Sequence, residues 1–100
     1  MDQPKAIHIS GRRWFEKTNG NTYHSVRIYV DGEHVHTIPF EYGYGSQWEW
    51  TARGWLENAG YLPGIEARPG SPGEALWVYC ERKGIKLVRE VVDVSRKRDL

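Results

Sequence analysis

The sequence is poor in cysteine, in net charge and in long hydrophobic runs, and each shortage excludes a class of protein. Cys80 is the one cysteine in 100 residues, which rules out an internal disulfide and a zinc site built on cysteines. The 14 basic and 13 acidic residues leave a formal net charge of +1, too little to coat nucleic acid by bulk charge. No apolar run approaches the roughly 18–20 residues that a membrane helix needs.

The N-terminal sequence MDQPKAIHIS also lacks the apolar stretch of a signal peptide. With the scarcity of cysteine, this predicts a soluble protein of the cytoplasm with no membrane partner. The length suits one domain that spans residues 1–100. Aromatic residues are abundant in contrast. The 5 Trp, 6 Tyr and 2 Phe exceed what so small a core requires, so we expect several rings on the surface.

Two alternating segments joined by Asn19-Gly20 predict an antiparallel hairpin. KAIHIS and TYHSVRIYV place apolar and polar residues in turn, as half-buried strands do, and Asn-Gly is typical of a two-residue turn. We expect Thr18 and Asn21 to close that turn. The resulting opposed pairs are Ile9 with Val30, Gly11 with Ile28, Phe15 with His24, Arg12 with Arg27 and Trp14 with Ser25.

Asp31-Gly32 predicts a second tight turn, but two registers are open for the strand EHVHTIPF that follows. They place different side chains on the core side: Val35 and Thr37 after a two-residue turn, or Ile38 and Phe40 after a three-residue turn with a bulge at Gly32. Pro39 cannot donate a ladder hydrogen bond, so we expect an edge strand or a bulge near it.

Two helices follow, each with a recognisable start and end. In GSQWEWTARGWLENAG, Ser46 and Glu49 form a capping box and Gly60 ends the helix. Its apolar face repeats at helical spacing through Trp48, Ala52, Trp55, Leu56 and Ala59. In SPGEALWVYCERKG the expected signals are Ser71 as N-cap, Pro72 at the first helical position, Glu74 completing a capping box, and Gly84 ending the helix.

Residues 85–94, IKLVREVVDV, predict a last strand, and SRKRDL a short basic tail. The order of elements is therefore β-β-β-α-α-β. It predicts an α+β domain in which two helices pack on one face of an antiparallel sheet.

Short motifs along the chain carry a resemblance to known sequences. GRRWF, GNTYHSV, YGYG and the closing DV…RKRDL together resemble a group of short, uncharacterised proteins encoded by bacteriophages, from about residue 7 to the end. The resemblance implies a viral protein that works in the cytoplasm of a bacterial host. Small phage accessory proteins often bind host machinery or host defence factors, so it also favours a role in host takeover or counter-defence. It implies no site residues.

The pattern that buries Ile9, Phe15, Val26 and Ile28 turns a second set of side chains outward, namely Arg12, Trp14, Tyr23, Arg27 and Tyr29. Two arginines directly opposed are unfavourable unless an anion lies between them. Guanidinium groups among aromatic rings suit a nucleotide or a single-stranded nucleic acid, through phosphate contacts and base stacking. Alternatively, the last strand, a second subunit of a homo-oligomer or a foreign protein covers these rings.

Other candidates have weaker signals. YGYGS, before the first helix, could bring backbone N–H groups to a phosphate, but its spacing matches no phosphate-binding motif, which favours a simple capped turn. His34 and His36 project from one strand face and lack a third ligand, so we predict no metal and no cofactor. Cys80 should face the core. No nucleophile and base are paired by spacing, so we predict that the protein is not an enzyme.

Trp50 raises a separate question. It lies about 200° around the first helix from Trp48, with Gly54 one turn further on. The missing side chain of Gly54 leaves a shallow slot beside the indole. Either the second helix fills this slot, through Trp77 or Val78, or an outside partner does, since Trp is enriched at binding hot spots.

These features predict a non-catalytic phage accessory protein that acts by binding. Its candidate binding residues are Arg12, Trp14, Tyr23, Arg27, Tyr29 and Trp50. The expected ligand is an anion, either nucleic acid or a nucleotide signal that the protein sequesters. The alternative is a protein-binding inhibitor of a host enzyme or defence factor.

Overall fold

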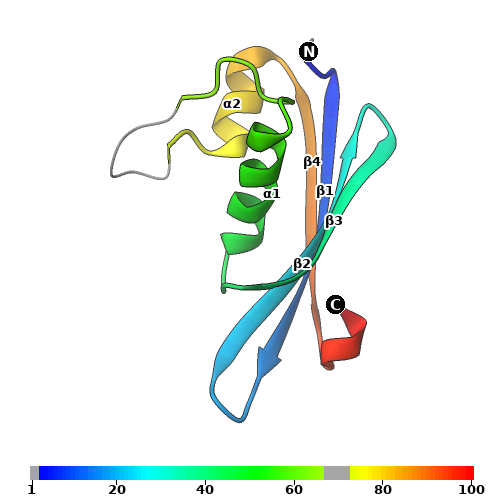
Figure 1. Ribbon diagram of the computed structural model, residues 1–100, viewed down its shortest axis with the longest axis vertical. Helices are drawn as coiled ribbons and strands as arrows, with labels where there is room; N and C mark the ends of the chain where they lie inside the picture. Colours follow the sequence, from blue (N-terminus) through cyan, green and yellow to red (C-terminus); the bar gives the residue numbers. More distant parts are fainter. Residues whose placement is uncertain (1–2, 67–72) are drawn as a thin grey trace.

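The computed structural model describes residues 3–66 and 73–100, which form a four-stranded sheet with two helices on one face (Figure 1). The strands are β1 (Ala6–Glu16), β2 (Asn21–Val30), β3 (Glu33–Tyr42) and β4 (Lys86–Val94). The helices are α1 (Gln47–Asn58), α2 (Leu76–Lys83) and a short C-terminal 3₁₀ helix, η1 (Lys97–Asp99). The predicted α+β class and the order β-β-β-α-α-β are confirmed.

The strands are arranged in the order β3-β2-β1-β4. The first three strands pair antiparallel, as predicted, but β4 pairs parallel to β1. The sheet is therefore mixed, and the prediction of a wholly antiparallel sheet is wrong for β4. A parallel neighbour needs a crossover connection, and α1 with α2 provides it. This connection places both helices on the same side of the sheet, and it leaves β3 and β4 at the edges.

The first hairpin forms where predicted, but its predicted register is wrong by two residues. Glu16 pairs with Asn21, so residues 17–20 make a four-residue loop in place of the two-residue turn. The Glu16 carboxylate accepts a hydrogen bond from the Asn19 N–H, and Gly20 closes the loop at φ 71°. Side chains keep their predicted faces, because a shift of two residues preserves the alternation.

The shift changes every opposed pair. Ile9 now faces Ile28, and Gly11 faces Val26. Arg12 faces Ser25 rather than Arg27, so the predicted direct opposition of two arginines is absent. Phe15 lies on the helix side, as predicted, but 54% of it is exposed, because the helices do not extend over the tip of the hairpin.

The third strand combines features of both predicted registers. Val30 pairs with Glu33, which is the two-residue turn, with Asp31 at φ 50° and Gly32 at φ 84°. The pairing then slips at two points along β3, which is an edge strand. As a result Val35 and Ile38 pack against the core, whereas Thr37 and Phe40 do not face it. Pro39 lies at the second irregularity, as its missing N–H requires.

The core lies between the sheet and the helices. Its buried apolar side chains include Ile7, Ile9, Val26, Ile28, Trp48, Ala52, Leu56, Leu76, Tyr79 and Cys80. Trp48 packs directly on the backbone of Gly11, where a Cβ atom would come within 2.6 Å of the indole. Trp55 is only partly buried and stacks on His36, with ring centroids 4.5 Å apart. No helix in the described part of the chain is long and apolar enough to span a membrane.

The helix ends agree with the sequence signals at the C-termini better than at the N-termini. After α1, the Tyr61 N–H bonds to the Leu56 carbonyl and the Gly60 N–H to the Glu57 carbonyl, which is a Schellman motif. Gly84 ends α2 at φ 71°. Ser46 occupies the N-cap position of α1, but its side chain makes no capping hydrogen bond, and Glu49 binds Arg89 instead.

The predicted start of the second helix is wrong in its position. α2 begins at Leu76, with Ala75 at the N-cap position, and Glu74 precedes the helix. Ser71 and Pro72 lie outside the described residues. The Glu74 carboxylate does not cap the helix, because Arg82 holds it in a two-point ion pair.

Leu56 is completely buried between α1 and the sheet. Leu56→Ala should therefore lower the free energy of unfolding by about 2–5 kcal/mol, through lost burial and a residual cavity. Chemical denaturation measures the change. Val78→Ala, at a partly exposed position of α2, is the matched control and should stay within about 0.5 kcal/mol. A loss below about 1 kcal/mol for Leu56→Ala would contradict the assigned core.

Candidate anion-binding site

The sheet face opposite the helices carries five of the six predicted site residues. We call it the open face. Its side chains come from all four strands: β1 (His8, Ser10, Arg12 and Trp14), β2 (Tyr23, Ser25, Arg27 and Tyr29), β3 (His34, Thr37, Phe40 and Tyr42) and β4 (Val88, Glu90 and Val92). The Glu90 carboxylate lies 3.1 Å from the His8 ring. Figure 1 shows the C-terminal η1 on this side, away from α1 and α2. Trp50 is not part of the open face.

Aromatic rings at one end of the open face stack on one another across three strands. Trp14 stacks on Tyr23 at 5.9 Å between ring centroids, and Tyr23 stacks on Phe40 at 4.7 Å. Tyr42 meets Tyr23 edge-on at 5.7 Å. Tyr23 thus has an aromatic neighbour on each side. Phe40 and Tyr42 were missed as site residues because their orientation depends on the slips in β3.

A second aromatic group lies at the opposite end of the open face. His8 stacks on Tyr29 at 5.2 Å, and His34 tilts against Tyr29 at 5.3 Å. The slip in β3 separates His34 from His36, which packs against Trp55 of α1. The prediction that both histidines share one face is therefore wrong. Among the described residues, no group of three potential metal ligands is found.

Two arginines and a serine lie between the aromatic groups. Arg12 pairs with Ser25 and Arg27 pairs with Ser10, so the arginines are diagonal neighbours, with backbones roughly 7–8 Å apart. Neither forms an ion pair with a carboxylate among the described residues. Ser25 is 1% exposed. The sequence predicted this proximity of the arginines, although through a different register.

Two polar atoms of this cluster are buried and have no hydrogen-bond partner in the described structure. They are Ser25 Oγ and Arg27 Nη1. Buried polar groups are almost always hydrogen-bonded, and an unsatisfied one costs roughly 1–3 kcal/mol, more when it is charged. Nothing in the sequence pattern distinguishes Ser25 from other outward-facing serines, so its burial could not be predicted.

The C-terminal residues fold back across the open face instead of trailing away as a tail. The Asp99 carbonyl accepts a hydrogen bond of 3.0 Å from Arg12 Nη1 on β1. The Lys97 ammonium lies 5.1 Å from the centre of the Phe40 ring on β3. Because β2 lies between these two strands, the segment 97–100 crosses over the position of Ser25.

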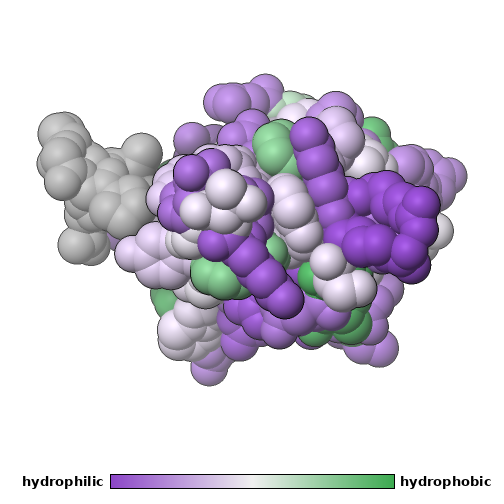
Figure 2. Space-filling model, turned by 90° about the horizontal axis from the view of Figure 1, so that it is seen from below, coloured by the Kyte–Doolittle hydropathy of each residue, from purple (hydrophilic) through white to green (hydrophobic). Residues whose placement is uncertain are grey.

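Figure 2 shows the end of the molecule that lies lowest in Figure 1. Outside the grey atoms, hydrophobic residues are visible there as separate spots between polar residues. Permanent subunit interfaces are usually continuous and apolar. The surface in this view is not continuous and apolar, and so differs from such an interface.

The other predicted candidates have structural roles. Burial raises the pKa of the Cys80 thiol to about 11, so the thiol is not an activated nucleophile. In the YGYGS loop, Gly43 and Gly45 offer carbonyls to His24 and Arg13. His24 is fully buried, and this burial lowers its pKa. Its second ring nitrogen lies 2.8 Å from the Thr51 hydroxyl, so it joins β2 to α1.

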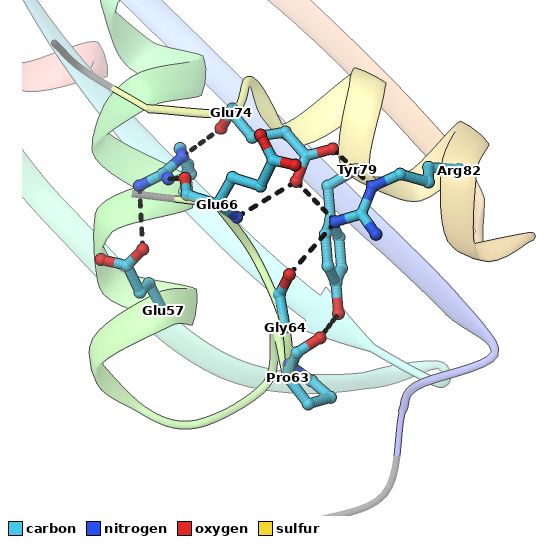
Figure 3. A network of polar contacts seen from close by, with 8 residues as sticks. Glu57, Pro63, Gly64, Glu66, Glu74, Tyr79 and Arg82 are labelled. Carbon is cyan, nitrogen blue, oxygen red and sulfur yellow. Dashed lines mark hydrogen bonds and ion pairs between the residues drawn. The ribbon is translucent and has the colours of Figure 1, made fainter. Parts of the chain in front are cut away.

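A network of charged side chains on the helix side is also structural (Figure 3). Arg82 makes two hydrogen bonds to Glu74, of 2.8 and 2.9 Å, and a third to the Gly64 carbonyl. Arg53, only 6% exposed, donates to the carbonyls of Glu66 and Glu74 and pairs with Glu57. Each of these charges has a partner, and together they hold the segments around residues 63–66 and 74 against both helices.

Arg82 lowers the pKa of Glu74 to about 2, from an ordinary value of 4.5. Because the folded-state pKa lies below the unfolded value, the stabilisation by this carboxylate is complete above about pH 5 and is lost as the pH falls toward 2. The stability difference between the natural protein and Glu74→Gln should therefore shrink over that range. Denaturation curves at several pH values measure it. Glu81→Gln, at an exposed position of α2, should show little difference at any pH, and a constant Glu74→Gln deficit down to pH 2 would contradict the assignment.

The surroundings of Trp50 do not fully match either predicted alternative, in which the second helix or an outside partner fills the slot beside it. Trp50 and Trp77 both line one cavity, so the second helix borders the space beside Trp50 without filling it. The guanidinium of Arg53 lies 5.8 Å from the centre of the Trp50 ring. A Cβ atom on Gly54 would meet nothing within 4 Å, as predicted for an open slot.

No protein-family model matches this chain, and neither a curated protein nor a solved structure is significantly similar to it. These comparisons leave the predicted likeness to bacteriophage proteins untested. Arguments about function therefore start from the geometry of the open face and of the cavity beside Trp50.

Proposed function

We propose that this is a non-catalytic binding protein for a phosphate-bearing ligand, which it holds at Arg12, Ser25 and Arg27 on the open face. The supporting observation is that Ser25 Oγ and Arg27 Nη1 are buried with no partner among the described residues. A phosphate oxygen would accept hydrogen bonds from both. Arg12, as a diagonal neighbour, would add a second positive charge, and charge-assisted hydrogen bonds to phosphate are strong.

The aromatic rings favour phosphate recognition over the base stacking that the sequence suggested. Tyr23 has Trp14 stacked on one side and Phe40 on the other, so a base has no free face there. The rings instead form walls that exclude water from the arginines, which strengthens each ionic hydrogen bond. A nucleotide signal and a single strand of nucleic acid share the phosphate group, and both fit this chemistry. In an infected bacterium, the protein would sequester the nucleotide signal or shield the single strand of nucleic acid.

Access to the cluster involves the C-terminal segment. Arg12 already donates to a main-chain oxygen, the Asp99 carbonyl. A phosphate oxygen is a stronger acceptor than a neutral carbonyl, so the ligand would replace this contact as the segment 97–100 moves aside. Lys97 and Arg98 would then lie beside the bound anion and add to its attraction.

The direct test is Arg27→Ala, with binding measured by fluorescence anisotropy. Two labelled probes separate the ligand sources: a nucleoside triphosphate and a single-stranded oligonucleotide. We expect the affinity for the better probe to fall at least tenfold and the slope of log K against log salt to fall by about 1, for one lost phosphate contact. Arg27→Lys should recover only part of the affinity, because lysine lacks the two-point geometry.

Lys17→Ala is the charge control, since Lys17 is exposed in the loop of the first hairpin. It removes one positive charge without touching the cluster and should leave the affinity nearly unchanged. Equal losses for Lys17→Ala and Arg27→Ala would mean that only net charge matters, and would contradict the proposed site. Binding that is insensitive to salt would instead indicate an apolar protein partner.

A further inference from the structure

A cavity of about 190 Å³ lies on the helix side of the sheet, where the first turns of α1 and α2 meet β4. Its lining includes Ser46, Glu49, Trp50, Leu76, Trp77 and Arg89. The two tryptophans belong to different helices. Trp77 is 48% exposed, whereas Trp side chains are highly buried on average.

Both helices reach the cavity through their first turns. Gly54, one turn beyond Trp50 on α1, is not part of the lining, and the space beside this glycine is open. α2 is only eight residues long, and no side chain caps its first turn, of which Leu76 and Trp77 line the cavity.

A neutral ion pair lies beside the indoles. Arg89 Nη1 bonds to Glu49 Oε1 at 2.7 Å, and the Arg89 guanidinium lies 6.0 Å from the centre of the Trp77 ring. The pair uses one carboxylate oxygen and one guanidinium nitrogen. Glu49 Oε2 and the remaining Arg89 nitrogens make no hydrogen bond within the described structure. A strong acceptor and a strong donor are thus adjacent.

We propose that this cavity binds a planar heteroaromatic ring that carries a donor and an acceptor on one edge, of which guanine is the best match. Indole rings favour flat aromatic ligands by stacking. The guanine N1–H and amino group would donate to Glu49, and its O6 would accept from Arg89. The volume suits one ring system, since pockets for larger ligands are usually about 300–1,000 Å³.

The charges disfavour the other ligand classes. A lone cation would meet Arg89 already in place over Trp77, and a lone anion would meet Glu49. A basic peptide side chain would have to displace Arg89 from both of its partners. A ring that carries a donor and an acceptor on one edge can form hydrogen bonds with both Glu49 and Arg89 while their ion pair stays intact. The inference does not rest on the proposed phosphate site, which lies on the opposite face of the sheet.

The test is a titration of the full chain with guanosine, followed through the indole N–H signals in two-dimensional NMR. Guanosine should shift the signals of Trp50 and Trp77 and leave that of Trp14, on the open face, unchanged. Adenosine has one amino donor beside the acceptor N1 and lacks the adjacent N1–H and amino donors that guanine offers to Glu49, so it should bind at least tenfold more weakly. Using a nucleoside without phosphate keeps this result separate from that of the open face.

Variants assign the contacts. Trp77→Ala should weaken guanosine binding at least tenfold while the rest of the spectrum stays that of the folded protein. Glu49→Gln should abolish the preference for guanosine over adenosine. Trp14→Phe, on the other face, should change neither. The proposal is overturned if millimolar guanosine shifts neither cavity indole, if Trp77→Ala binds as tightly as the natural protein, or if N-acetyl-argininamide shifts the two indoles in place of guanosine.

Discussion

The contact between Trp48 and Gly11 is the constraint on which the rest of this structure depends. The indole lies so close to the β1 backbone that a Cβ atom on Gly11 would be 2.6 Å from it. Interiors are close-packed, so no side chain could be added there without moving α1 away from the sheet. The contact therefore sets the height and rotation of α1. It also decides that Trp50, two residues later, points away from the core.

The two sides of the sheet differ in structure as a result. On the helix side, the rotation of α1 completes the core with Ala52 and Leu56 and turns Trp50 toward the first turn of α2. Neither α1 nor α2 covers the polar and aromatic side chains of the open face. The C-terminal segment lies there instead, held by Arg12 and Phe40. The proposed phosphate site and the proposed ring-binding cavity therefore lie on opposite faces of the sheet.

Most of the secondary structure could be predicted because it depends on local chemistry. Gly60 and Gly84 end helices as left-handed glycines do, and strand alternation assigned the correct face to Arg12, Trp14, Tyr23, Arg27 and Tyr29. The register of the first hairpin could not be predicted, because Asn19-Gly20 fits a two-residue turn as well as a longer loop. The Glu16 carboxylate, which stabilises the longer loop, is not a recognised turn signal.

Features that depend on contacts between distant parts of the chain could not be predicted from the sequence. The slips in β3 send Phe40 to the open face and separate His34 from His36. Pro39 predicted an irregularity near it, but no residue marked the slip between His34 and His36. Residues 97–100, some seventy residues later in the chain than Ser25, return to the open face and contact Arg12 and Phe40. Glu74 carries the signature of a capping box, yet Arg82 on the next turns of α2 competes successfully for its carboxylate.

The central claim is that the arginine cluster of the open face receives a phosphate group. The most direct measurement follows the arginine side-chain Nε–Hε signals by NMR while inorganic phosphate, and then a short single-stranded oligonucleotide, is added to the full chain. The account predicts saturable shifts of the Arg12 and Arg27 signals, together with those of residues 97–100, and no shift for Arg82, which Glu74 already holds. Uniform small shifts of all arginines, or shifts that leave Arg27 unaffected, would contradict it.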